Sequence, residues 1–230
     1  MERKEFIKKG LFSFGSLMIG QSLLASCTTN NSSSTTANNS CAVSPSETAG
    51  PFPIKTPSEL VKSNIVMDRT GVALLVKLTI QDKNCKPLKD VFVDIWHCDK
   101  DGLYSEYGGS GMQKEDLTNV HFLRGRQKTN ELGEVSFISI YPGWYSSRAP
   151  HIHIEILNSS SKSLLVTQAA FPEEISKEVY NSPLYVGHGQ ADTPNLSDNV
   201  FSDSLSGNMA KISGNIKDGY TLTKTIVVNA

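Results

Sequence analysis

The chain has 230 residues, of which 38% are hydrophobic and 20% charged, and its formal net charge is -1. These values are ordinary for one globular domain. No basic tract follows the N-terminus, so nucleic acid is not expected as a partner. After residue 30, no stretch reaches the roughly 20 apolar residues of a membrane-spanning helix. The composition therefore predicts a single soluble domain.

Residues 1–26 are typical of a bacterial export signal. A basic start is followed by an apolar run, Leu11–Ala25. The run ends in Leu24-Ala25-Ser26-Cys27, which resembles the lipobox, a motif whose cysteine becomes diacylated. An ordinary signal peptide with a nearby cysteine is the alternative. Because two acyl chains make a stable anchor, we expect a lipoprotein of the cell envelope that touches the membrane only through Cys27.

Residues 27–44 contain the run TTNNSSSTTANNS and offer little apolar surface to bury. Such a segment does not offset the entropy cost of ordering, so it is expected to be a flexible tether. The folded domain is then expected over residues 45–230. Besides Cys27, the chain has Cys41, Cys85 and Cys98. One disulfide and one free thiol are expected, and the pairing stays open.

The folded part is mostly β in character. Segments rich in β-branched and aromatic residues predict strands over 72–81, 91–96, 134–140, 151–157, 164–170 and 220–228. Only Glu173–Tyr180 is expected to be helical, because Pro172 precedes it and two acidic residues suit its N-terminal end. Short strands separated by turns indicate a sandwich or a barrel. We expect an all-β, antiparallel-dominated β-sandwich with long loops and one short helix.

A candidate metal strand reads His-Ile-His-Ile-Glu-Ile from His151. Strand side chains alternate, so the isoleucines face one way and His151, His153 and Glu155 the other. The imidazoles lie about 7 Å apart along the strand, close enough to share a metal. A solvated face with two histidines is one alternative. A triad of all three polar residues around Fe(II) or Zn is another, although it must converge from about 13 Å.

Two upstream segments can return side chains to that strand. The loop YPGWYSSRAP at 141–150 contains two prolines and a glycine, so it bends sharply and brings Tyr145 and Arg148 back over the sheet. The strand and turn VDIWHCDKDGLYS at 93–105 delivers Tyr104.

These segments resemble the intradiol ring-cleavage dioxygenases, which include the protocatechuate and catechol dioxygenases. The combination of strand-Gly-x-Tyr, Pro-Gly-x-Tyr and Arg-x-x-His-x-His is highly specific. The matching segments lie in order along nearly the whole folded part, at 50–54 (GPFPI), 93–105, 124–156, 167–180 and 192–201 (DTPNLSDNVF).

The resemblance implies that Tyr104, Tyr145, His151 and His153 bind a non-haem ferric ion. Fe(III) is a hard, highly charged cation that stabilises phenolate oxygen, which explains the two tyrosines. The resemblance also makes Tyr145 the ligand that leaves the metal when the substrate binds, taking up a proton from it.

The implied reaction cleaves a small aromatic diol with O2, between its two hydroxyl-bearing carbons, to a muconate-type dicarboxylate. Arg148 occupies the family position of a fixed cation that stabilises negative charge on the ring. Gln168 matches a position near the substrate. A surface ion pair for Arg148 and solvent exposure for Gln168 are the alternatives. A non-catalytic β-sandwich lipoprotein that binds a ligand or partner is the alternative for the whole chain.

The other histidines and arginines are expected to have supporting or surface roles. His97 is expected to be structural, His121 to line the pocket mouth, and His188 to lie in a surface loop. Arg124 and Arg126 support the pocket or form ion pairs. The loop between Tyr145 and His151 is shorter than in protocatechuate enzymes, which predicts a more open site for larger catechols. The helical dimerisation region of cytosolic catechol dioxygenases has no counterpart here, so the oligomeric state stays open.

Overall fold

The computed structural model describes residues 40–50, 59–109 and 111–230. The expected export signal, Cys27, most of the expected tether and the stretch 51–54 lie outside these residues. Within them, no helix combines the length and the apolar character needed to cross a bilayer.

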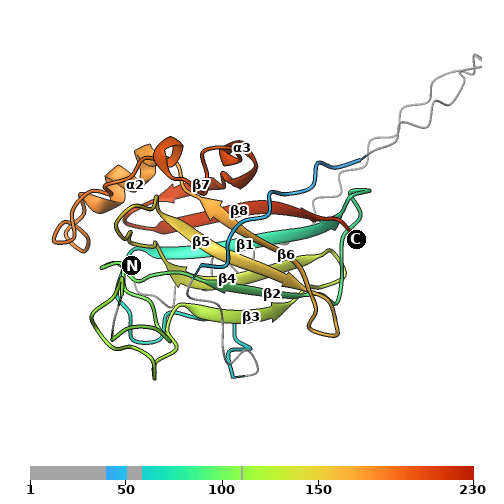
Figure 1. Ribbon diagram of the computed structural model, residues 1–230, viewed down its shortest axis with the longest axis horizontal. Helices are drawn as coiled ribbons and strands as arrows, with labels where there is room; N and C mark the ends of the chain where they lie inside the picture. Colours follow the sequence, from blue (N-terminus) through green and yellow to red (C-terminus); the bar gives the residue numbers. More distant parts are fainter. Residues whose placement is uncertain (1–39, 51–58, 110) are drawn as a thin grey trace, which may run out of the picture.

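Two four-stranded sheets form the domain (Figure 1). The first has the order β4 (Glu134–Ile140), β1 (Ala73–Asp82), β8 (Gly219–Val228) and β7 (Lys211–Asn215). The second has the order β3 (Arg124–Lys128), β2 (Phe92–Trp96), β5 (His151–Leu157) and β6 (Ser163–Ala170). Only the β1–β8 pair of these sheets is parallel. The predicted antiparallel-dominated sandwich is confirmed.

The largest hydrophobic cluster of the described residues draws on both sheets. On β1, the alternate residues Leu74, Val76 and Leu78 are at most 1% exposed, and the three isoleucines of β5 are fully buried in the same cluster. The alternation expected for β5 is therefore confirmed, with isoleucines inward. The histidines lie on the outer face of the second sheet.

That outer face carries a row of side chains in register across all four strands. Trp96 pairs with Arg124 on one side and with His153 on the other, and His153 pairs with Gln168. Register partners place their side chains on the same face of a sheet. The segments that follow β2, residues 97–109 and 111–123, lie at the end of the sandwich where β2 stops (Figure 1). His151 and His153 are 3% and 0% exposed, so the solvated-face alternative is wrong.

The helix α2 (Glu173–Tyr180) has the bounds expected from the sequence. The short helices η1 (Asn195–Ser197) and α3 (Leu205–Asn208) were not expected, nor were β3 and β7. The domain therefore holds more than one short helix.

Cys41 and Cys85 form the one disulfide found among the described residues, and Cys98 is free and buried. The backbone N–H of Cys41 donates to Lys83 O at 2.9 Å, and that of Ser44 donates to Val227 O at 2.9 Å. The last residues of the expected tether are thus attached to the domain. The disulfide and these hydrogen bonds hold Cys41 and Ser44 against the sandwich.

Candidate metal centre

Three potential ligand atoms converge on the outer face of β5. The Nε2 atoms of His151 and His153 lie 3.1 Å apart, and Tyr145 Oη lies 3.3 Å from His151 Nε2. Metal–ligand bonds of about 2.1 Å that meet at about 90–110° place ligand atoms about 3.0–3.4 Å apart. The observed separations therefore suit three ligands of one metal ion.

Tyr104 borders the same point and is 1% exposed. Its ring centroid lies 5.7 Å from that of Tyr145 and 6.1 Å from that of His153. An Asp turn after β2 sets its position, because Asp99 Oδ1 accepts from Leu103 N at 3.0 Å. The amide oxygen of Gln113 then accepts from Tyr104 N at 2.7 Å. The structure thus brings all four expected metal ligands together.

The loop that carries Tyr145 packs directly on the turn that delivers Tyr104. Gly143 N donates to Asp99 O at 3.0 Å, and a Cβ on Gly143 would lie 2.5 Å from that oxygen. A side chain is excluded here by this close approach. His188 stabilises the same loop: its Nε2 donates to Trp144 O at 2.8 Å, and its ring lies against that of Trp144, with centroids 4.6 Å apart and planes tilted by 40°. His188 therefore supports the loop and is not an unattached surface residue.

Both histidines are prepared to bind a cation. His151 Nδ1 lies 2.6 Å from Ala149 O and must donate to it, which leaves the Nε2 lone pair free to bind a metal. Burial lowers the pKa of His151 to about 3, with a further contribution from Arg148. Burial also lowers the pKa of His153 well below its usual value. Trp96 stacks on His153 with an interplanar angle of 3°, which fixes the ring orientation.

The two tyrosines need a strong cation to ionise. Burial raises the pKa of Tyr145 to about 12 and raises that of Tyr104 well above its usual value. A highly charged, oxygen-seeking ion at the point of convergence favours the phenolates and opposes this effect. Two neutral imidazoles and two phenols therefore fit the ferric ion that the sequence resemblance implies.

The alternative triad of His151, His153 and Glu155 is not formed. Across the described parts of the chain, no three His, Cys, Asp or Glu side chains gather around a possible metal position. Glu155 is the register partner of Asp94, and both carboxylates are close enough to Arg126 to raise its pKa. Glu155 therefore belongs to the next row of the sheet.

Arg148 connects the metal centre to a buried carboxylate. Its Nε donates to both carboxylate oxygens of Asp198, at 2.9 and 3.0 Å, and its Nη2 donates to Gln168 Oε1 at 2.7 Å. Its Nη1 donates to Tyr145 Oη at 3.3 Å. Gln168 is itself fixed because its amide donates to Thr48 O at 2.9 Å. Arg148 thus forms an ion pair with Asp198, but this pair is buried and is not the surface ion pair of the alternative. It directs the guanidinium toward the candidate ligands. Gln168 is fully buried, so its solvent-exposed alternative is wrong.

Comparison with known proteins agrees with this geometry. A family model described as Dioxygenase matches residues 50–181. The intradiol ring-cleavage dioxygenase of Tetranychus urticae is 31% identical with a TM-score of 0.74, over 82% of this chain and 95% of that one. This chain belongs to the intradiol ring-cleavage dioxygenase family.

Curated relatives of the family match more partially. Chlorocatechol 1,2-dioxygenase of Rhodococcus opacus is 28% identical over 123 residues, which is 45% of this chain and 45% of that protein. The protocatechuate 3,4-dioxygenase beta chain of Burkholderia cepacia is 29% identical over 110 residues, which is 44% of this chain and 46% of that protein. The chain thus spans a little under half the length of each of these relatives.

Other charged residues of this family member support the framework. His97 is buried between Cys98 O and Ser139 Oγ, both 2.7 Å from its ring nitrogens, so its structural role is confirmed. His121 pairs with the buried carboxylate of Glu106 at 2.8 Å and is partly exposed.

The two arginines of β3 differ in what they hold. Arg124 is buried and donates to Ser105 O at 2.6 Å, next to Tyr104, so it supports the ligand segment. Arg126 forms an ion pair with Asp94, with a 2.6 Å Nη2–Oδ2 contact. Sequence reasoning missed the role of Asp198, although it lies within the matching stretch 192–201.

Proposed function

We propose that this chain is a non-haem Fe(III)-dependent dioxygenase that cleaves a catechol-type ring between its two hydroxyl-bearing carbons, giving a muconate-type dicarboxylate. The observation that carries the proposal is the convergence of Tyr145 Oη, His151 Nε2 and His153 Nε2, with neighbouring separations of 3.1 and 3.3 Å, beside the buried Tyr104. Membership of the intradiol family supports the same reaction class.

Tyr104, Tyr145, His151 and His153 are the residues proposed to hold the ion. The chemistry that a bound ferric ion supplies is withdrawal of electron density from the catecholate, which makes the ring reactive toward O2. Two phenolates offset two of its three charges, and neutral imidazoles add none.

Tyr145 is proposed to accept a proton from the incoming diol. Burial, which raises its pKa to about 12, favours the protonated phenol once the oxygen is no longer bound to a cation. Arg148 Nη1 donates to Tyr145 Oη at 3.3 Å and its charge lowers this pKa, but the effect of burial is larger. A proton moved to Tyr145 therefore stays there while the substrate occupies the centre.

Arg148 is proposed to stabilise negative charge that develops on the ring. Its side chain is only 11% exposed, so its charge is weakly screened by water. Asp198 and Gln168 hold the guanidinium from behind, so little reorganisation is needed during the reaction. Gln168 is proposed to act through Arg148 as well as to border the substrate.

A hollow of about 590 Å³ opens beside Arg148 and is lined by polar residues that include Ser146, Ser147 and Asp192. None of the four proposed ligands lines this hollow, but Arg148 does, so we propose it as the side from which catechols larger than the parent diol approach. The carboxylate of Asp192 accepts from Ser146 Oγ at 2.9 Å and from Ser147 N at 3.2 Å, which holds that wall in place.

Oxygen uptake by the iron-loaded protein with a panel of catechols tests the proposal, and product mass identifies intradiol cleavage. Tyr104→Phe and Tyr145→Phe should each abolish or strongly shift a visible phenolate-to-iron absorption band. Tyr107→Phe is the matched control, because Tyr107 packs against the same aromatic cluster without belonging to the proposed ligand set. Iron binding with no visible band, or a band that survives both ligand substitutions, would refute the proposed centre. A normal band without oxygen uptake would favour the non-catalytic alternative.

We also propose that the protein is exported and anchored through a lipid on Cys27. The disulfide between Cys41 and Cys85 supports an oxidising compartment, because such bonds persist outside the reducing cytosol. Metabolic labelling with a fatty acid, compared between the native chain and Cys27→Ser, tests the anchor. Equal labelling of both chains would contradict it.

A further inference from the structure

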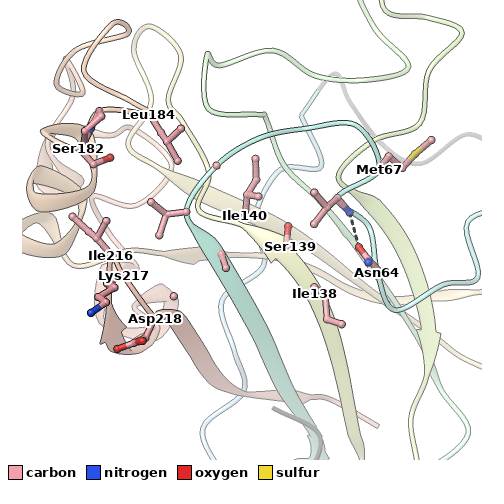
Figure 2. A pocket seen from close by; sticks show the side chains of 16 residues that line it. Asn64, Met67, Ile138, Ser139, Ile140, Ser182, Leu184, Ile216, Lys217 and Asp218 are labelled. Carbon is pink, nitrogen blue, oxygen red and sulfur yellow. Dashed lines mark hydrogen bonds between the residues drawn. The ribbon is translucent and has the colours of Figure 1, made fainter. Parts of the chain in front are cut away.

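A second hollow, of about 580 Å³, lies away from the metal centre, and none of the four proposed ligands lines it. Its walls come from the start of β1, the end of β4, the segment after α2 and the turn between β7 and β8 (Figure 2). The volume falls within the roughly 300–1,000 Å³ of small-molecule sites. We call this hollow the β1–β4 groove.

The β1–β4 groove is mostly apolar. Ile138 and Ile140 on β4 form part of its floor, and Leu184 and Ile216 stand opposite them (Figure 2). Leu184 and Met67, at its margin, are 42% and 53% exposed. Exposed apolar side chains gathered around one hollow are typical of a binding site, because water solvates them poorly.

Ser182 adds one polar group to this apolar lining. Its residue is only 5% exposed, and its hydroxyl has no hydrogen-bond partner among the described residues. Figure 2 shows its oxygen on the side turned toward the strands. A buried hydroxyl without a partner is unfavourable. Because the oxygen has almost no exposed surface, a molecule in the groove must displace part of the lining to accept a hydrogen bond from it.

The charge at the groove margin is balanced. Lys217 and Asp218 stand side by side in the β7–β8 turn, and both line the groove (Figure 2). Asp218 also accepts from Asn215 Nδ2 at 3.1 Å. Adjacent opposite charges give no net attraction for an ion, so this margin favours an uncharged occupant.

We propose that the β1–β4 groove binds a small, neutral and mostly apolar molecule that carries one hydrogen-bond acceptor for Ser182 Oγ. The apolar walls supply most of the affinity, and the hydroxyl sets the orientation. The site is separate from ring cleavage, so the two proposals stand or fall independently.

Titration of the iron-loaded full chain with Nile red, a neutral apolar dye that has a carbonyl acceptor, tests the proposal. We expect saturable binding of one dye per chain with a blue shift of its emission. Ser182→Ala should weaken binding about three- to tenfold, the effect of losing one hydrogen bond. Leu184→Asp should weaken it more than tenfold, because the dye then desolvates a carboxylate. Met67→Asp should act in the same direction and serves if the Leu184 variant folds poorly.

Leu132→Asp is the matched control, because Leu132 is 58% exposed and lies outside the groove. It should bind the dye like the native chain, and so should Tyr145→Phe, whatever its effect on ring cleavage. Equal binding by the Leu184 and Leu132 variants, non-saturable binding, or an unchanged affinity after Ser182→Ala would overturn the proposal. Tighter groove binding of the anionic dye 1-anilinonaphthalene-8-sulfonate would overturn the neutral class.

Discussion

The buried pair of Arg148 and Asp198 should dominate the response to mutation around the metal centre. Asp198 is fully buried, and each of its oxygens also accepts from the backbone: Oδ1 from Val200 N and Oδ2 from Ala149 N, both at 2.8 Å. Asparagine at this position would turn an NH2 group toward one of these N–H donors in either orientation. Asp198→Asn therefore cannot reproduce the contacts of the carboxylate.

The expected cost of Asp198→Asn is about 3–5 kcal/mol of unfolding free energy, the range for removing one partner of a buried ion pair. Arg148→Met should cost less, because the Asp198 carboxylate keeps its two backbone donors. The double variant should lose less than the sum of the two single losses, by about 1–3 kcal/mol, because the second substitution breaks a contact that is already absent.

Urea unfolding of the native chain, both single variants and the double variant measures this coupling. Oxygen uptake on the same four proteins tests whether Asp198 acts through Arg148, in which case the double variant should be no slower than Arg148→Met. Stability losses that add within about 0.5 kcal/mol would refute the contact.

Three further outcomes are expected. Burial holds the pKa of His97 at about 4, below its usual 6.5, so the unfolded state binds more protons between these values. The unfolding free energy of the native chain should fall by about 3 kcal/mol more than that of His97→Gln as the pH drops from 6.5 to 4. An equal fall in both proteins would show that His97 is not the group responsible. Replacing Cys41 and Cys85 by serine should lower the unfolding free energy by up to about 4 kcal/mol, as a 44-residue separation implies, and no change in urea midpoint would contradict the bond. Gly143→Ala should displace the Tyr145 loop from Asp99 O and weaken the visible iron band, whereas an unchanged band would show that the loop tolerates a Cβ.

Regular hydrophobic alternation made several elements predictable from the sequence. The strands β4 and β5 and the helix α2 have the bounds expected, because each presents one apolar face to the core. The strand β3, with the sequence RGRQK, has no such pattern. Its core contact is made by Gly125, where a Cβ would lie 2.5 Å from Ile65, so it resembles a polar loop in sequence. The edge strand β7 is mostly exposed and gives equally little signal.

The candidate ligands were predictable for a different reason. Tyr145, His151 and His153 lie within nine residues of one another, and the resemblance to the intradiol family, more than their spacing, implies that they share one ion. Asp198 lies 50 positions from Arg148, and only the folded chain brings them together. Nothing in the local sequence distinguishes this carboxylate from an exposed one.

The row of register partners across β3, β2, β5 and β6 links metal binding to the order of folding. Tyr104 follows β2, whereas His153 lies on β5, and they meet only when these strands pair with Trp96 opposite His153. A slip of one residue would turn both histidines toward the core and an isoleucine toward the ligand position. Iron uptake should therefore follow long-range strand pairing, so a bound ion would report that the sheet had reached its native register.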